Sequence, residues 1–271
     1  MRTGWLVACA GAVLALAACQ REAGSPRQDQ AAEEAATPQQ GEVPVLRDVM
    51  ETDARYIVGI SYPPEANRYP GLAVELHRYA DAARAALMDA VEGAPADSNA
   101  GPYDLSLAFT TVADTPQVFA IAADGSSYTG GAHAQPLVAR FVWLPGPNRL
   151  LQVRDLFRGE DAWRELSIHA REQLHTALSQ RIDADGLDQA ERERVMRSVA
   201  RMIDAGTEPD PDNFTNFEPV VGADGRIRAL RFVFPPYQVG PYSDGVQTVE
   251  IPARALLPHV AEEYRALFSG G

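Results

Sequence analysis

Both cysteines of the chain lie near its N-terminus, and their position limits what can stabilise the fold. Cys9 and Cys19 are the only cysteines among the 271 residues. The long remainder of the chain therefore cannot form a disulfide bond, a zinc-thiolate site or a cysteine nucleophile. Its stability must come from a packed core. Hydrophobic residues make up 46% of the sequence, enough to build the core of one large or two small domains.

The first nineteen residues predict a lipoprotein signal peptide. Arg2 precedes the apolar stretch WLVACAGAVLALAA (5–18), which is too short to span a bilayer because about 20 residues are needed. The stretch leads into LAAC (16–19), which matches the bacterial lipobox at all four positions. We expect cleavage before Cys19 and lipidation of its thiol; an ordinary secretory signal is the alternative. Gln20 follows the cysteine, which favours the periplasmic face of a Gram-negative outer membrane.

The remainder of the chain predicts a tether and a folded part. Residues 20–44 are rich in Gln, Ala, Glu and Pro and contain almost no large apolar side chains, so we expect a disordered tether. Residues 45–153 and 154–268 are expected to form two closely associated α+β subdomains. No second apolar segment is long enough to cross a membrane.

Hydrophobic periodicity predicts strands interrupted by helices. A β-branched, alternating stretch predicts a strand at 54–63, and a helix is expected from Pro70 to about Val91, with an apolar side chain every three or four residues. In the rest of the chain we expect strands at 103–113, 117–124, 136–144, 149–153 and 248–252, helices at about 161–181, 188–204 and 256–268, and a hairpin around Asp224–Gly225. Because this order lacks βαβ regularity, it predicts an α+β fold with antiparallel or mixed sheets and packed helices.

The charge of the chain argues against several classes of partner. The formal net charge is −13 at pH 7, every cationic side chain apart from histidine is an arginine, and no basic run occurs. Nucleic acid and anionic lipid headgroups are therefore poor partners for the folded part. A basic protein partner fits this charge better.

The segment GSSYTGGAHAQP (125–136) concentrates glycine, serine, tyrosine and histidine. Its serines do not lie in the G-x-S-x-G turn of a serine hydrolase. Its glycines suit sharp chain reversals: Gly125 is expected to allow a turn after Asp124, and the pair at 130–131 to adopt positive φ. The segment therefore favours a structural or surface-binding loop, in which His133 fixes the loop first and takes part in function second.

Catalysis by this loop remains an alternative to binding. A small envelope hydrolase or wall-modifying enzyme would use the segment from Tyr128 to His133. That alternative requires His133, a carboxylate and the hydroxyl of Ser126, Ser127 or Tyr128 to converge in one cleft.

No metal or cofactor motif supports another chemistry. DADGLD (183–188) resembles a calcium loop only faintly, because aligning Gly186 with the required glycine puts Arg181 and Arg192 at ligand positions. The five histidines are spaced unsuitably for joint ligation. We therefore predict no catalytic residue, no metal site and no cofactor.

A proline- and tyrosine-rich segment, FVFPPYQVGPYSDGVQTVEIP (232–252), is the second unusual stretch. A double proline (235–236) and a Gly-Pro pair (240–241) interrupt strand formation, which predicts a kinked segment that exposes Tyr237 and Tyr242. Two interpretations remain open. The tyrosines either cover the core at an irregular sheet edge, or form a rigid aromatic surface that recognises a partner or a glycan.

Four segments together carry a resemblance to a known architecture. In chain order they are YIVGISYP (56–63), YTGGAH (128–133), LLQVRDLF (150–157) and LRFVFPPYQVGPYSDGVQTVEIP (230–252). Across about residues 45–268 the chain resembles a pair of bacterial domains of unknown function. The pair occurs in the extracytoplasmic part of RsiV-type anti-sigma factors, which bind lysozyme, and beside the catalytic domain of PdaC-type peptidoglycan deacetylases.

The resemblance implies an envelope-facing module that binds a lysozyme-type protein or peptidoglycan. The chain shows neither a sigma-binding segment nor the metal motifs of the deacetylases, so those two activities do not carry over. We therefore expect a non-catalytic, lipid-anchored binding protein of the cell envelope. The expected ligand-contacting residues are Tyr128, Thr129, His133, Tyr237 and Tyr242.

Overall fold

The computed structural model describes residues 43–94 and 102–271. The predicted signal peptide, Cys19 and nearly all of the predicted tether lie outside the described residues. The described residues belong to one compact unit. Within the described ranges, no helix combines the length and the hydrophobicity needed to cross a membrane.

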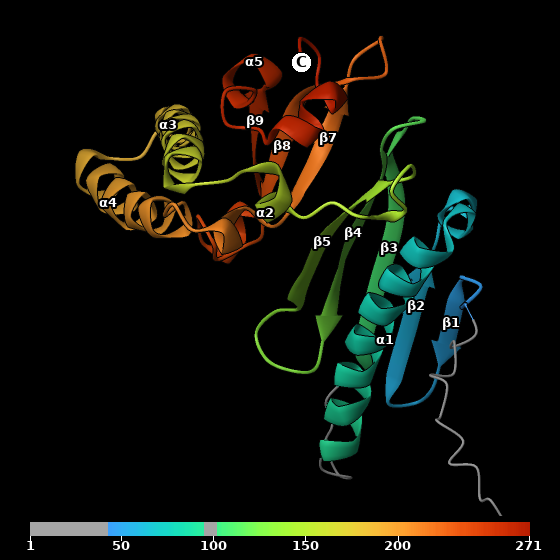
Figure 1. The fold of residues 1–271 in the computed structure, drawn as a ribbon. Coiled ribbons are helices and arrows are strands. Elements are labelled where there is room, and N and C mark those ends of the chain that lie inside the picture. Colours follow the sequence, from blue (N-terminus) through green and yellow to red (C-terminus); the bar gives the residue numbers. More distant parts are fainter. Residues whose placement is uncertain (1–42, 95–101) are drawn as a thin grey trace, which may run out of the picture. The chain divides into compact units, whose positions relative to one another are not determined.

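A six-stranded sheet occupies the N-terminal half of this unit (Figure 1). Its strands follow one another in chain order, β1-β2-β3-β4-β5-β6. The pair β2–β3 is parallel and the other pairs are antiparallel, because α1 connects β2 to β3 whereas turns and short loops connect the rest. The elements are β1 (Val49–Thr52), β2 (Tyr56–Ser61), α1 (Pro70–Gly93), β3 (Tyr103–Asp114), β4 (Phe119–Tyr128), β5 (Gln135–Leu144) and β6 (Arg149–Leu150).

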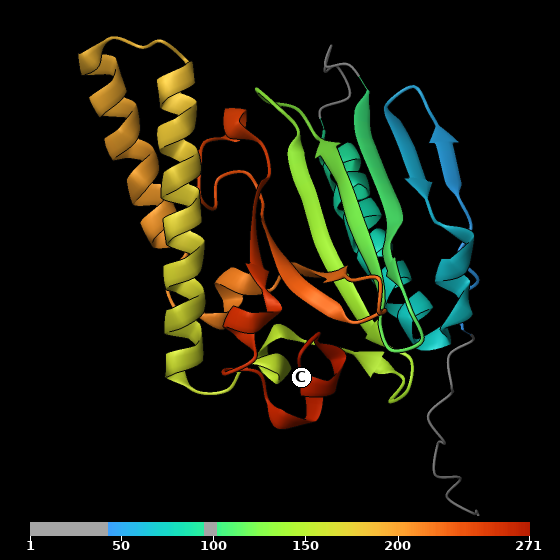
Figure 2. The same ribbon diagram turned by 90° about the horizontal axis from the view of Figure 1, so that it is seen from above.

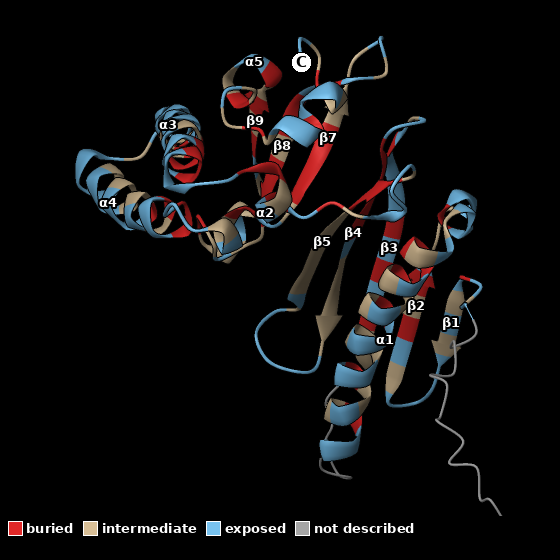
Figure 3. Cartoon of the chain, in the orientation of Figure 1, coloured by how far each residue is buried: buried red, intermediate tan, exposed pale blue. Residues whose placement is uncertain are grey.

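Helix α1 lies across one face of the six-stranded sheet (Figures 1 and 2). It begins at Pro70 as predicted, where the missing N–H of proline costs no helical hydrogen bond. Most of the predicted apolar stripe is buried, including Leu72, Leu76, Leu87 and Val91. These side chains pack against strand residues such as Leu105, Phe119 and Ile121 to form one core. Figure 3 marks buried residues on α1 and on the strands beside it.

The C-terminal half contains a three-stranded antiparallel sheet, β7-β8-β9. The predicted turn at Asp224–Gly225 joins β7 to β8, with Gly225 at a φ of 76° and the Gly222 N–H donating to the Arg226 carbonyl at 2.8 Å. Helix α3 contacts both α4 and β9. The elements are α2 (Val153–Leu156), α3 (Glu160–Ala184), α4 (Gln189–Gly206), β7 (Phe217–Val221), β8 (Ile227–Phe234), β9 (Gln247–Pro252) and α5 (Ala253–Leu256), with short 3-10 helices at Pro64–Arg68, Pro211–Phe214, Tyr242–Asp244 and Glu262–Leu267. The α+β class is confirmed.

Three local predictions are wrong. Gly125 makes no turn after Asp124, because β4 continues to Tyr128 and Gly125 pairs with Leu107 and Leu137. The strand predicted at 149–153 ends at Leu150, and Val153 already begins α2. In place of the closing helix predicted at 256–268, the chain forms only a short 3-10 helix at Glu262–Leu267.

The closing segment breaks because proline interrupts it. Pro258 lacks a backbone N–H and cannot donate a helical hydrogen bond, and its ring disfavours a helical turn before it. The chain instead forms an isolated bridge between Val260 and Phe157. Buried apolar side chains nevertheless recur every four residues here, at Leu256, Val260, Tyr264 and Phe268. That spacing imitates one face of a helix, which explains the wrong prediction.

The two sheets meet at β5 and β7. The larger hydrophobic core contains residues of both sheets, including Val142 and Phe232. Beside it, the Nε of Arg140 lies 2.9 Å from Glu218, and the two side chains are only 8% and 10% exposed. Glu218 also pairs with Arg231 at 2.9 Å. A nearly buried ion pair therefore links the six-stranded sheet to the three-stranded one.

Candidate functional site

The loop 129–134 connects β4 to β5 and carries the YTGGAH motif to a hairpin tip. Gly130 and Gly131 have φ values of 94° and 105°, which confirms the predicted positive φ. The hydroxyl of Tyr128 donates to the Gly131 carbonyl at 3.2 Å, so this tyrosine closes its own loop. Thr129 is exposed.

The connection 235–246 joins β8 to β9 and is held by several hydrogen bonds. Tyr237 has a φ of 75°, a left-handed conformation that a bulky side chain rarely adopts. Its N–H donates to the Gly240 carbonyl at 2.9 Å. The side-chain amide of Gln238 donates to the carbonyls of Gly206 and Asn213 at 3.0 and 2.9 Å. The surrounding structure therefore fixes the unusual backbone at Tyr237.

A further contact anchors the same connection to α3. The carboxylate of Asp244 lies 2.7 Å from the guanidinium of Arg181, and the Asp244 side chain is only 15% exposed. The side-chain amide of Gln247 donates to the Asp244 carbonyl at 2.6 Å. The connection is thus held at both ends, which keeps the side chains between them in defined positions.

The two segments meet through three rings, His133, Tyr237 and Tyr242, which we call the aromatic cluster. His133 Nε2 lies 2.7 Å from the Tyr237 hydroxyl oxygen. The His133 and Tyr242 rings are stacked, with centroids 4.1 Å apart and an interplanar angle of 16°. The Tyr237 and Tyr242 rings lie 5.8 Å apart. Residues separated by about a hundred positions in the sequence therefore form one side-chain group.

The aromatic cluster is accessible to solvent. Tyr237 is 50% exposed, His133 is exposed and Tyr242 is half-buried. Tyr237 therefore does not cover the core, which was one of the two interpretations of this segment. A stack with one partly buried and two exposed rings can bind a planar or apolar ligand group with little loss of side-chain freedom.

The contacts of His133 indicate what chemistry the cluster can support. Its Nδ1 lies 3.3 Å from the Ala134 carbonyl oxygen and its Nε2 faces Tyr237. In the described part of the chain, no carboxylate and no serine hydroxyl forms a hydrogen bond with this ring. Ser126 and Ser127 are paired within the β-ladder, and adjacent strand residues point to opposite faces. Among the described residues, no hydrogen bond therefore links His133 to the groups that an active site in this loop would use.

The structure brings three of the five predicted ligand-contacting residues together and leaves out Tyr128, at the end of β4, and Thr129, in the loop. Sequence reasoning missed Gln238 and Asp244, whose contacts hold the connection in place. Neither residue belongs to a recognisable sequence motif. Only their position inside the proline- and tyrosine-rich segment could have suggested a role. Across residues 43–94 and 102–271, no group of three or more His, Cys, Asp or Glu side chains is placed to hold a metal ion.

Comparisons with known proteins place the chain by similarity. The family model described as "Protein of unknown function (DUF3298)" matches residues 154–254. A DUF3298 family protein from Pseudomonas aeruginosa PAO1 is 17% identical, with a TM-score of 0.50 over 85% of this chain and 98% of the other. A member from Bacteroides fragilis NCTC 9343 is 15% identical, with a TM-score of 0.47 over 83% and 96%. No curated protein matches. At these identities the similarity to solved structures concerns the fold alone.

Proposed function

We propose, starting from the match of residues 154–254 to the DUF3298 family model, that the protein is a non-catalytic binding protein of the bacterial cell envelope. Its ligand in this proposal is a lysozyme-type hydrolase, recognised through the aromatic cluster. Peptidoglycan is the second ligand to test. The proposed position is the periplasmic face of the outer membrane, with lipidated Cys19 as the anchor.

The observation that carries the proposal is the exposed, rigidly held aromatic cluster. Tyr237 keeps a left-handed backbone at a φ of 75°, which costs about 1–3 kcal/mol and persists only where the surroundings determine it. Such strain concentrates at ligand-binding sites, and tyrosine is enriched at interface hot spots. The cluster also unites YTGGAH with the proline- and tyrosine-rich segment, the two most specific of the segments on which the resemblance to lysozyme-binding domains rests.

Charge supports a basic protein as the ligand. The chain has a formal net charge of −13, and complementary charge accelerates encounter and selects partners more than it strengthens the final complex. A basic lysozyme would therefore be drawn to the protein, while the aromatic cluster would supply short-range contacts. If charge acts mainly on the encounter, added salt should weaken binding by lowering the association rate.

The test is retention of the full-length protein, solubilised in detergent, on immobilised lysozyme and on purified peptidoglycan. We expect retention on lysozyme that decreases as ionic strength rises. Tyr237→Ala and His133→Ala should reduce it, whereas His169→Ala, a histidine change in α3 away from the cluster, should leave it unchanged. Retention on peptidoglycan alone would identify peptidoglycan, and not lysozyme, as the ligand. Retention on neither matrix would refute the proposal.

A further inference from the structure

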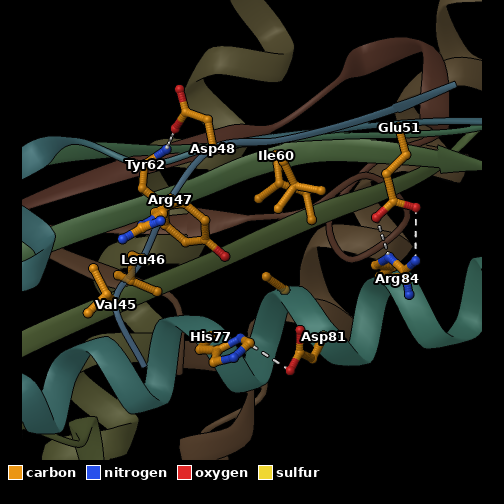
Figure 4. Close-up of a pocket in the computed structure, with 12 residues that line it drawn as sticks. Val45, Leu46, Arg47, Asp48, Glu51, Ile60, Tyr62, His77, Asp81 and Arg84 are labelled. Atoms are coloured by element: carbon orange, nitrogen blue, oxygen red, sulfur yellow. Dashed lines mark hydrogen bonds and ion pairs between the residues drawn. The ribbon is translucent and has the colours of Figure 1, made fainter. Parts of the chain in front are cut away.

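A cavity of about 370 Å³ lies between the segment 45–51, β2 and α1 (Figure 4). Its volume falls in the range of small-molecule sites, roughly 300–1,000 Å³. It contains no residue of the aromatic cluster. The lining residues are Val45, Leu46, Arg47, Asp48, Val49, Glu51, Ile60, Tyr62, His77, Ala80, Asp81 and Arg84.

The apolar part of the cavity is preformed. Leu46, Ile60 and Ala80 are buried and line it together with Val49. Two hydrogen bonds fix the outer wall: the Leu46 N–H donates to Asn67 Oδ1 at 2.8 Å, and the Asn67 side-chain amide donates to the Leu46 carbonyl at 3.1 Å. A ligand with a small aliphatic group would therefore find an apolar surface that needs no rearrangement.

One end of the cavity is closed by an ion pair. Arg84 donates to both carboxylate oxygens of Glu51, from Nε at 3.0 Å and from a terminal nitrogen at 2.8 Å. The hydrogen bond from Arg84 lowers the pKa of Glu51, so the carboxylate stays ionised at neutral pH. Because these two charges neutralise each other, the remaining polar groups determine which ligand fits.

The remaining polar groups offer donors and acceptors that the chain leaves unused. Among the described residues, neither the Arg47 guanidinium nor the Tyr62 hydroxyl forms a hydrogen bond or an ion pair. Asp48 accepts from the Tyr62 N–H through one oxygen at 2.9 Å, and Asp81 contacts His77 through one oxygen at 3.1 Å. Each carboxylate therefore keeps a second oxygen available. In Figure 4 the side chains of Arg47, Tyr62, His77 and Asp81 lie around one space, whereas the Asp48 carboxylate points away from Asp81.

The Tyr62 ring is held in place and remains a donor. It stacks on Phe109 with centroids 4.6 Å apart and an interplanar angle of 10°. Burial, with the nearby charges of Asp81 and Asp48, raises the pKa of Tyr62 to about 12. Its hydroxyl is therefore protonated at neutral pH and can donate to a ligand oxygen.

We propose that this cavity binds a small zwitterion, an α-amino acid or a short peptide with free termini. Arg47 and the Tyr62 hydroxyl would bind the carboxylate, Asp81 the ammonium group, and the apolar surface an aliphatic side chain. A purely anionic ligand would meet the Asp81 carboxylate, and a purely cationic one the Arg47 guanidinium. A ligand that carries both charges matches this mixed lining, and Arg favours carboxylate through paired N–H donors.

Calorimetric titration of the full-length protein with dialanine, in its L,L and D,D forms, tests the proposal. N-acetyl-dialanine amide, which has the same side chains but no charged terminus, is the matched ligand control. We expect at least one unblocked form to bind and the blocked form to bind about tenfold or more weakly. Absence of binding by both unblocked forms at millimolar concentration, or equal affinity for the blocked form, would overturn the proposal.

Variants distinguish this site from nonspecific binding. Arg47→Ala and Asp81→Asn should each weaken dialanine binding about tenfold. Arg55→Ala, beside β2 but outside the cavity, and Asp89→Asn, two turns further along α1, should not. If the controls weaken binding equally, the assignment is wrong. Retention on lysozyme should be unaffected by Arg47→Ala, so the failure of either proposal leaves the other intact.

Discussion

At the scale of single residues, Tyr237 has a backbone conformation that is unfavourable for its side chain. Its φ of 75° places the Cβ too close to its own backbone, a cost of roughly 1–2 kcal/mol for a residue other than glycine. The bond between its hydroxyl and His133 Nε2 is solvent-exposed and offsets only part of that cost. Local stability alone would favour glycine at this position, which is consistent with the proposed binding role of the aromatic ring.

Replacing Tyr237 separates the strain from the side-chain contacts. Tyr237→Ala and Tyr237→Gly lose the same contacts, but only glycine relieves the backbone. We therefore expect the glycine variant to be more stable than the alanine variant by about 1 kcal/mol, measured by urea unfolding. At Tyr242, which has no positive φ, the order should be reversed because glycine loses more chain entropy. The same order at both positions would contradict this account.

The Tyr62 phenol predicts a loss of stability at high pH. Its pKa is raised from 10.0 to about 12 in the folded protein, so unfolding favours deprotonation. The resulting stability is complete below pH 10 and is lost as the pH rises towards 12. Burial also raises the pKa of Tyr79, which acts in the same direction.

Urea unfolding checks this dependence. It is measured between about pH 9 and pH 12, a range that includes both the ordinary and the raised pKa of Tyr62. Tyr62→Phe should lessen the decline in the free energy of unfolding, and the double variant with Tyr79→Phe should lessen it further. An unchanged slope in both variants would mean that these phenols titrate alike in the folded and unfolded chain.

At the scale of secondary-structure elements, Gly125 explains how β3 and β4 approach each other. A Cβ built on Gly125 would lie 2.0 Å from the Ser106 carbonyl oxygen and 2.9 Å from the Leu107 Cα. Both atoms belong to the backbone of β3, so no side-chain rotation can remove the clash. Glycine is thus required by close strand packing and not by a turn.

Gly125→Ala should therefore destabilise the protein strongly. We expect a loss of about 3 kcal/mol in the free energy of unfolding, as for overpacked sites that need a backbone shift. Gly146→Ala is the control, because a Cβ there meets nothing within 4 Å and should change stability by about 0.5 kcal/mol or less. Equal effects at the two glycines would show that the strands can separate at little cost.

Sequence periodicity predicted the elements that bury one continuous face. Helices α1, α3 and α4 follow the expected ranges closely, because long amphipathic stripes leave few alternatives. Prediction failed at β1, which was not expected at all, and at the segment after Leu256. A strand of four residues carries too little pattern to recognise. The buried side chains after Pro258 are spaced as in an α-helix, although the backbone forms a bridge at Val260 and a short 3-10 helix at Glu262–Leu267 instead.

The candidate site was predictable in its parts but not in its assembly. Glycine and proline patterns marked both loops, and the tyrosines stood out as exposed candidates. The meeting of His133 with Tyr237 depends on packing between β5 and β7, a contact between distant segments that local patterns do not encode. The cavity beside α1 was missed for the same reason, since its polar residues come from three separate segments.

At the scale of the whole molecule, a network of ion pairs joins the six-stranded sheet to the three-stranded sheet. Arg140 contacts Asp124 and Glu218, each at 2.9 Å, and Glu218 continues to Arg231. Because Arg140 and Glu218 are almost fully buried, their attraction is little screened by water. The network thus connects β5, which follows the loop 129–134, to β7 and β8.

Removing Arg140 should leave Glu218 as an uncompensated buried charge. Arg140→Leu is expected to lower the free energy of unfolding by about 3–5 kcal/mol. Arg228→Leu, which breaks the exposed pair with Glu250, should lower it by about 1 kcal/mol or less. A small effect at Arg140 would indicate that the two sheets are held by apolar packing alone.

The most direct test of the proposed lysozyme recognition is hydrogen–deuterium exchange of the full-length protein with and without lysozyme. Both the loop 129–134 and the connection 235–246 should become protected in the complex, and Tyr237→Ala should abolish the protection in both. The cavity segment 45–51 should exchange unchanged. Binding with protection confined to other surfaces, or no change in exchange anywhere, would contradict recognition through the aromatic cluster.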